Sequence, residues 1–245
     1  MPVTVDVISD VICPWCYVGK RRLETAVAAA AGRHAVVVRW HPFQLNPDMP
    51  RAGVERRAYR AAKFGSWERS LELDARLAAV GAGEGIEFAF DRIARTPNTL
   101  DAHRLIRLAG ERGVQDAVVE ALFRAYFTLG RDIGDRGTLL ELAAGAGLDR
   151  DLAAVELDGA DGLEAIRAVE GEARRLGVQS VPFFVVNGEL ALAGAQEPGA
   201  FLAAFERVSD EEPVAGEGGT CAVEPGREAA ARSAGKDRPK LPGDW

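Results

Sequence analysis

The 245-residue sequence is poor in cysteine and histidine, with three of each. It has no run of about 18 apolar residues, the length that a membrane-spanning helix needs, so no membrane segment is predicted. Its N-terminus lacks the basic start and apolar stretch of an export signal. Asp and Glu outnumber Lys and Arg, giving a formal net charge of −7, and such a chain is not expected to bind nucleic acid. These absences predict a cytoplasmic protein, whose thiols are mostly kept reduced.

Hydrophobic periodicity gives the start of the chain a β-α-β order. Residues Val3–Ser9 alternate between apolar and polar side chains, as in a half-buried strand. Residues 15–32 have helical spacing and end at Gly32, a typical C-cap. Residues 34–41 are rich in β-branched side chains and predict a second strand.

The middle of the chain has a different pattern. Residues 50–176 show repeated helical spacing, separated by Gly or Pro, and predict five or six helices without a strand. Strand signals return at 181–187 and 189–194, on either side of an Asn-Gly hairpin signal. A last helix is expected over 197–208, and the remaining residues are rich in Gly, Pro and charge.

This order predicts an α/β protein with a thioredoxin-like fold and an inserted all-helical subdomain. Residues 1–48 form the first part of the thioredoxin-like domain, and residues 49–176 form the insertion. Residues 177–208 complete the domain, and residues 209–245 form a polar C-terminal tail.

Two of the three cysteines, Cys13 and Cys16, stand three residues apart. Structural zinc usually needs four Cys or His ligands, and the remaining candidates form no second close pair. They are Cys221, His34, His41 and His103. A purely structural disulfide would close too short a loop to constrain the unfolded chain much. No metal is therefore predicted, and dithiol redox chemistry is favoured.

The position of the motif also favours redox chemistry. Cys13 is expected at a helix N-terminus, where unpaired N–H groups and the helix dipole stabilise a thiolate. Pro14 suits the first helical turn because it has no N–H to leave unpaired. The Cys13 thiolate would attack a substrate disulfide, and Cys16, one turn later, would resolve the mixed disulfide.

A second candidate element is Val181-Pro182, at the start of the third predicted strand. In a thioredoxin-like fold this position faces the cysteine pair. A cis bond before Pro182 would turn the Val181 backbone outward to pair with an extended substrate, whereas an edge-strand proline is the structural alternative. Pro14, Trp15 and Val181 are the predicted substrate-binding residues.

Four segments, "SDVICPWCYVG", "RWHPFQLNP", "TPNTLDAHRL" and "GVQSVPFFVVNG", together resemble the DsbA-type oxidoreductases of the FrnE group. That group is related to 2-hydroxychromene-2-carboxylate isomerases and kappa-class glutathione transferases. The resemblance covers about residues 3–208. It implies a thioredoxin fold with a helical insertion, Cys13 as nucleophile, Cys16 as resolving cysteine and Pro182 as a cis-proline.

The sequence departs from the related groups at three points. The isomerase and transferase branches usually have Ser at the position of Cys13, so the cysteine pair favours the oxidoreductase branch. Many thioredoxin-like proteins have a buried acid where this chain has Val7, and Asp6 or Asp10 is the nearest substitute. Some FrnE proteins carry a second cysteine pair in the tail, where this chain has Cys221 alone.

Other residues have a weaker claim to function. His41 and His103 are candidate proton donors, although packed or capping roles are more usual. Asn98 or Thr99 is expected to cap a helix in a segment that borders the cleft between the domains. The many Arg and Glu residues of the inserted helices are expected on solvated faces.

The sequence leaves three functional hypotheses open. The first is a thiol–disulfide oxidoreductase that acts on protein or small-molecule disulfides or dithiols, with no metal or organic cofactor but with glutathione left open as a co-substrate. The second is a glutathione-dependent isomerase or transferase of an aromatic metabolite, which would not need Cys16. The third is a non-enzymatic partner-binding module, which would tolerate the loss of both cysteines.

Overall fold

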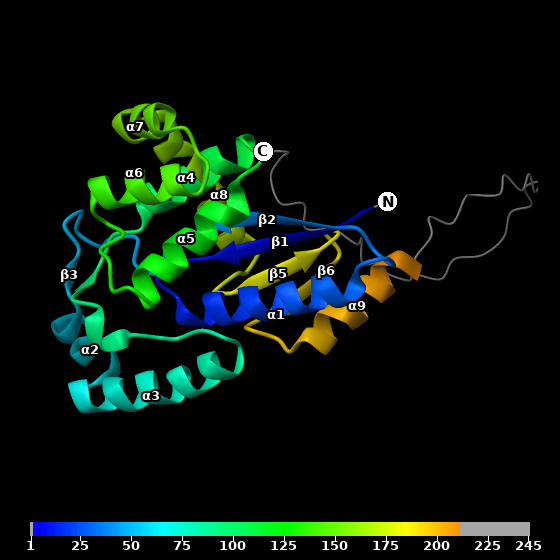
Figure 1. The fold of residues 1–245 in the computed structure, drawn as a ribbon, viewed down its shortest axis with the longest axis horizontal. Helices are drawn as coiled ribbons and strands as arrows, with labels where there is room; N and C mark the ends of the chain where they lie inside the picture. Colours follow the sequence, from blue (N-terminus) through cyan, green and yellow to red (C-terminus); the bar gives the residue numbers. More distant parts are fainter. Residues whose placement is uncertain (1, 211–245) are drawn as a thin grey trace, which may run out of the picture.

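A computed structural model of the protein describes residues 2–210, and the predictions for residues 211–245, including Cys221, lie outside this part. The fold is a mixed sheet with helices packed around it (Figure 1). Its elements in chain order are β1 (Val3–Ser9), α1 (Pro14–Ala30), β2 (Val36–Pro42), β3 (Val54–Glu55), α2 (Arg56–Phe64), α3 (Trp67–Gly83), a 3-10 turn (Phe90–Arg92), β4 (Arg95–Thr96), α4 (Leu100–Glu111), α5 (Gln115–Phe127), α6 (Arg136–Gly145), α7 (Arg150–Asp158), α8 (Asp161–Arg175), β5 (Phe183–Val186), β6 (Leu190–Ala193) and α9 (Pro198–Asp210).

The main sheet has the strand order β2-β1-β5-β6. Strand β1 lies parallel to β2 and antiparallel to β5, and β5 and β6 form an antiparallel hairpin. The hairpin turns through Asn187, Gly188 and Glu189, and the Glu189 N–H donates to the Val186 carbonyl at 3.0 Å. Asn187 and Gly188, the two central residues of this turn, both have positive φ. The Asn187 side chain also accepts a hydrogen bond from the Thr4 N–H at 2.8 Å, which ties the turn to β1.

Helices α1 and α9 pack against each other along the sheet, while α4, α5 and α8 contact β2 (Figure 1). The core is continuous between the sheet and the inserted helices. Tyr17 of α1 stacks on Phe123 of α5 at 5.0 Å between ring centroids, and Phe123 in turn lies near Phe127. This aromatic packing fixes the insertion against the helix that begins at Cys13.

The inserted region differs in detail from the sequence prediction. It contains seven α-helices, α2–α8, rather than five or six. The first stretch of helical spacing in this region, residues 57–81, is divided at Gly65, which has φ +91. Ser66 begins α3 by accepting the Arg69 N–H. One of the additional helices is α7, whose nine residues give only a short stretch of helical spacing. Two short strands, β3 and β4, also pair here, although no strand was expected.

Candidate active site

Cys13 lies at the junction between β1 and α1. Its N–H donates to the Asp10 carbonyl at 2.9 Å, which closes the turn after the strand. Its backbone is extended, and Pro14 follows as the first residue of the helix. Cys13 is thus the N-cap residue of α1, and its thiol makes no capping hydrogen bond. The sequence prediction for this junction agrees with the structure, and the sulfur is free to act on other groups.

Cys16 lies one helical turn behind Cys13, and its N–H donates to the Cys13 carbonyl at 3.0 Å. Both cysteines are free thiols, with 6% of Cys13 and 1% of Cys16 exposed. Burial raises the pKa of the Cys16 thiol well above its ordinary value, and the neighbouring Cys13 raises it further. Hydrogen bonds from Ser9 and the Asp10 backbone oppose this pKa shift. Cys16 is therefore protonated and shielded, whereas Cys13 forms the outer face of the pair.

The bond between Val181 and Pro182 is cis. The Cys13 thiol donates to the Val181 carbonyl at 3.5 Å, so the segment before β5 lies directly beside the motif. Helix α1 can approach this segment because it has Gly19 at the contact. A Cβ atom at that position would lie 3.1 Å from both Pro182 Cγ and Phe184 Cζ. Sequence reasoning placed Pro182 near the cysteines but did not identify Gly19, whose importance depends on a contact across the fold.

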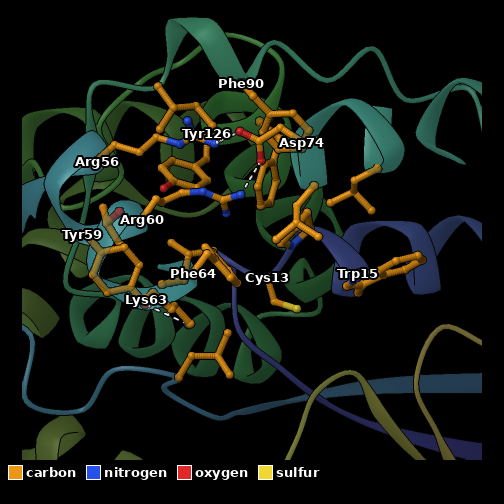
Figure 2. A pocket seen from close by; sticks show the side chains of 18 of the residues that line it. Cys13, Trp15, Arg56, Tyr59, Arg60, Lys63, Phe64, Asp74, Phe90 and Tyr126 are labelled. Carbon is orange, nitrogen blue, oxygen red and sulfur yellow. Dashed lines mark hydrogen bonds and ion pairs between the residues drawn. The ribbon is translucent and has the colours of Figure 1, made fainter. Parts of the chain in front are cut away.

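A cavity of about 420 Å³ opens beside Cys13, between the start of α1 and helices α2 and α3 (Figure 2). Pro14 and Trp15 border it, and Trp15 remains 45% exposed. Most of its walls are aliphatic or aromatic. These wall residues include Ile12, Leu45, Phe64, Leu73, Leu77, Val80, Phe90, Ile93 and Phe127.

The polar wall of the cavity is a network of ion pairs. Asp74 of α3 accepts from Arg56 and from Arg60 of α2, each at 2.6 Å. Arg60 also donates to the Ser70 hydroxyl, and its guanidinium lies over the Phe64 ring at 4.6 Å. Burial lowers the pKa of Arg60 and raises that of the neighbouring phenol of Tyr126. The cavity therefore joins an apolar interior to a fixed cluster of charge.

The expectation that the charges of the inserted helices are solvated is wrong for Arg56 in this cluster and for Arg104 of α4. Arg56 is 4% and Arg104 1% exposed, and both have buried polar partners. A sequence signal existed for α2, since Arg56, Arg60 and Lys63 recur at the spacing of one helix face. The sequence could not show that this face points toward Cys13.

His41 and His103 do not line this cavity. His41 pairs with Asp6 at 2.8 Å, and His103 lies 3.4 Å from Asp10. Both histidines instead border a second cavity of about 330 Å³ beside β2. Asp10 is fully buried and also accepts the Leu45 N–H. The carboxylates suggested by the sequence are therefore the partners of the two histidines.

Only part of the segment 96–99 contributes to the cavity beside Cys13. Thr96 lines the cavity beside Cys13. Thr99 is the N-cap residue of α4, but its side chain makes no capping bond. Asn98, just before it, accepts the N–H of Leu100, the first residue of the helix, at 2.9 Å. Within residues 2–210 no group of three or more Cys, His, Asp or Glu side chains has the arrangement of a metal site. In the same part of the chain, no helix is long and apolar enough to span a membrane.

The fold and the motif agree with a known family. The family model of the DSBA-like thioredoxin domain matches residues 4–206, and the chain belongs to this family. A probable DsbA oxidoreductase from Streptomyces coelicolor is 34% identical, with a TM-score of 0.79, over 98% of this chain and 100% of its own.

Two more distant structures share the fold. The cytosolic disulfide reductase DsbM from Pseudomonas aeruginosa, solved with GSH, is 24% identical with a TM-score of 0.60, over 84% of this chain and 99% of its own. A 2-hydroxychromene-2-carboxylate isomerase is 18% identical with a TM-score of 0.64, over 85% and 97% of the two chains. The expected fold class, a thioredoxin-like domain with a helical insertion, and the resemblance to the DsbA-type group are thus confirmed.

Proposed function

We propose that the protein exchanges disulfides through a dithiol formed by Cys13 and Cys16. The main support is one juxtaposition: the outer thiol of Cys13 begins α1 and lies 3.5 Å from the Val181 carbonyl. Cys16 is buried immediately behind it. A nucleophile needs access to substrate, and a resolving thiol needs access to the nucleophile's sulfur. This arrangement gives each cysteine one of these two properties.

In the reductive direction the Cys13 thiolate attacks one sulfur of the substrate disulfide. The substrate S–S bond breaks, a mixed disulfide forms, and one substrate thiolate leaves. Cys16 then loses its proton and attacks the Cys13 sulfur, which releases the second substrate thiolate and leaves the Cys13–Cys16 disulfide. The substrate gains two electrons from the protein dithiol. The reverse sequence oxidises a substrate dithiol.

Val181, Pro182, Pro14 and Trp15 are the proposed substrate contacts. Val181 presents its carbonyl beside the Cys13 sulfur, so an extended segment on either side of a substrate disulfide can hydrogen-bond there. Trp15 is large and half exposed next to the nucleophile, and aromatic side chains in such positions contribute contact area.

Glutathione is the proposed small co-substrate in a cytoplasmic setting. Two glutathione molecules would reduce the Cys13–Cys16 disulfide to the dithiol and become oxidised glutathione. The P. aeruginosa reductase solved with GSH supports this choice by its shared fold, and the cavity beside Cys13 offers room for a small thiol.

A redox titration tests the proposal. The protein is equilibrated in glutathione buffers, quenched with acid, alkylated and analysed by mass spectrometry. Cys13 and Cys16 should pass together from dithiol to intramolecular disulfide. The Cys16→Ser variant should accumulate a mixed disulfide at Cys13, and Cys13→Ser should lose turnover. A Cys13→Ser variant as active as the parent would refute the proposal.

A glutathione-dependent isomerase or transferase is the second candidate. The observation in its favour is the apolar cavity beside Cys13 in a fold shared with an isomerase. It predicts that activity survives Cys16→Ser and that the titration ends at a glutathione adduct of Cys13. The same experiment therefore separates the two candidates.

A further inference from the structure

We propose that the cavity beside Cys13 selects small disulfides that have an apolar body and an anionic group. Arg60 and Lys63 of α2 bind the anionic group. The inference rests on the proposed role of Cys13 as nucleophile and names the substrate class of that site. It is based on the excess of cationic over anionic side chains in a largely apolar cavity.

The shape and walls of the cavity fit the apolar part of such a ligand. A volume of about 420 Å³ lies within the range of small-molecule sites, which are mostly apolar with a few fixed polar groups. Phe64, Phe90 and Phe127 contribute aromatic rings, and Leu77 and Ile93 contribute aliphatic surface. A ligand with an aromatic or aliphatic body buries this surface.

The charged residues that line the cavity do not balance. Four are cations, Arg56, Arg60, Lys63 and Arg76, and one, Asp74, is an anion. The chain as a whole has a formal net charge of −7, so this excess of cations is local and opposite in sign to the molecule. A recess lined by one sign of charge attracts ligands of the other sign.

The buried Arg56 and the partly buried Arg60 share a single carboxylate. Asp74 pairs with Arg56 through Oδ2 and with Arg60 through Oδ1, so the cluster of three groups keeps one positive charge in excess. Figure 2 shows the Arg60 side chain reaching across the cavity toward Asp74, while Cys13 lies on another wall. A buried charge needs a partner, and a ligand carboxylate would supply it.

Specific donors remain for that carboxylate. The hydrogen bonds of Arg60 use Nε and Nη2, and its Nη1 has no partner within the described part of the chain. Lys63 donates to the Tyr59 hydroxyl at 2.9 Å, and no carboxylate of residues 2–210 forms an ion pair with it. Both cations come from one face of α2, which borders the same cavity as the Cys13 thiol.

The probe is an aryl disulfide with one carboxylate on each ring, dithiobis-nitrobenzoate. Its uncharged counterpart is dithiobis-nitropyridine. In either case the Cys13 thiolate attacks one sulfur, the S–S bond breaks and one coloured aryl thiolate leaves. Cys16 then displaces the second aryl thiolate, and the protein dithiol becomes the Cys13–Cys16 disulfide. Stopped-flow absorbance records each release.

The measured quantity is the ratio of the rate constants for the charged and the uncharged disulfide. Lys63→Gln and Arg60→Gln should each lower this ratio by about tenfold, because each removes one cation from the cavity. Added salt should lower the ratio in the parent protein and less so in the variants. Normalising to the uncharged disulfide removes any effect of the substitutions on the reactivity of the Cys13 thiol itself.

Arg57→Gln is the matched control. Arg57 is on the same helix and carries the same charge, but it is exposed and does not line the cavity. Its variant should keep the ratio of the parent. Lys63 is also exposed and holds no ion pair in the described residues, so Lys63→Gln decides the matter even if Arg60→Gln fails to fold.

Two failures can be told apart. If neither disulfide reacts at Cys13, the proposed function is wrong. If the uncharged disulfide reacts and forms the Cys13–Cys16 bond, but Lys63→Gln and Arg57→Gln leave the same ratio as the parent, the redox function holds. The selection of anionic substrates by α2 is then overturned.

Discussion

The thiol of Cys13 and the carbonyl of Val181 lie 3.5 Å apart, although 168 positions separate them in the sequence. The contact joins the start of α1 to the segment that leads into β5. The cysteine motif follows β1, and the segment that contains Val181 and Pro182 leads into β5. Because β1 pairs directly with β5, one sheet positions both.

Alkylation should distinguish the two cysteines. Burial raises the pKa of the Cys16 thiol well above its ordinary value, and only 1% of the residue is exposed. Iodoacetamide at about pH 7.5 should therefore modify Cys13 in the folded, reduced protein and leave Cys16 unmodified, since the thiolate is the reacting form. Peptide mapping by mass spectrometry measures both sites. Unfolded protein, in which both cysteines should react alike, is the control, and faster labelling of Cys16 in the folded state would contradict the prediction.

The same pKa shift predicts how the stability of the reduced protein depends on pH. The folded state raises the pKa of Cys16, so the neutral thiol is favoured in the native protein. This contribution is complete below the unfolded-state pKa of about 8.5 and is lost as the pH rises above it, because the unfolded chain then releases a proton that the folded chain keeps. Urea unfolding from about pH 7 to pH 10 should show the decline. The Cys16→Ser variant should lose less stability over this range, and parallel curves would refute the assignment.

The ion pairs of the cavity wall should matter for stability because they are buried. The side chains of Asp74 and Arg56 are 7% and 5% exposed. Asp74→Asn leaves the buried Arg56 and the partly buried Arg60 without their carboxylate and should lower the free energy of unfolding by about 3–5 kcal/mol. Asp158→Asn is the matched control, since its pair with Arg136 is 70% and 46% exposed and should cost less than about 1 kcal/mol. If denaturant unfolding showed equal losses of unfolding free energy for Asp74→Asn and Asp158→Asn, the buried ion pairs would stabilise the protein no more than an exposed one.

Gly19 should tolerate no larger side chain. A Cβ atom there already meets Pro182 and Phe184 at 3.1 Å, so Gly19→Val forces α1 away from the loop beside Cys13. Overpacking of this kind costs about 1–3 kcal/mol. Gly171→Val in α8 is the control, because a Cβ atom at that position meets nothing within 4 Å. Thermal unfolding should show a loss for Gly19→Val alone, together with slower reaction of Cys13 with a disulfide.

The local features of this fold were predictable from the sequence. Strand β1 has the predicted bounds, Val3–Ser9, and its burial alternates as far as Val7. The Asn187-Gly188 turn adopts the positive φ values that its dipeptide indicates. The start of α1 at Pro14 follows from the chemistry of a helix N-terminus. Each of these features depends on residues that are neighbours in the sequence, and short-range physical rules describe such neighbours well.

The cavity was not predictable in the same way. Arg56 looked like a surface residue because its helix is rich in charge, yet it is buried against Asp74, 18 positions later. The partner that makes burial tolerable lies on another helix, and the sequence does not show how two helices face one another. The division between α2 and α3 had a visible signal in Gly65-Ser66, which helical spacing on both sides obscured.

The strand order also bears on how the protein is made. Strand β1 leaves the ribosome well before its neighbour β5, which is synthesised only after all of the inserted helices, as the bond between Thr4 and Asn187, 183 positions apart, illustrates. Contacts over such long separations form late because the intervening chain must first be ordered. During synthesis Cys13 and Cys16 therefore lack the segment that contains Val181 and Pro182. The nascent chain carries a thiol pair that is not yet enclosed by its own fold.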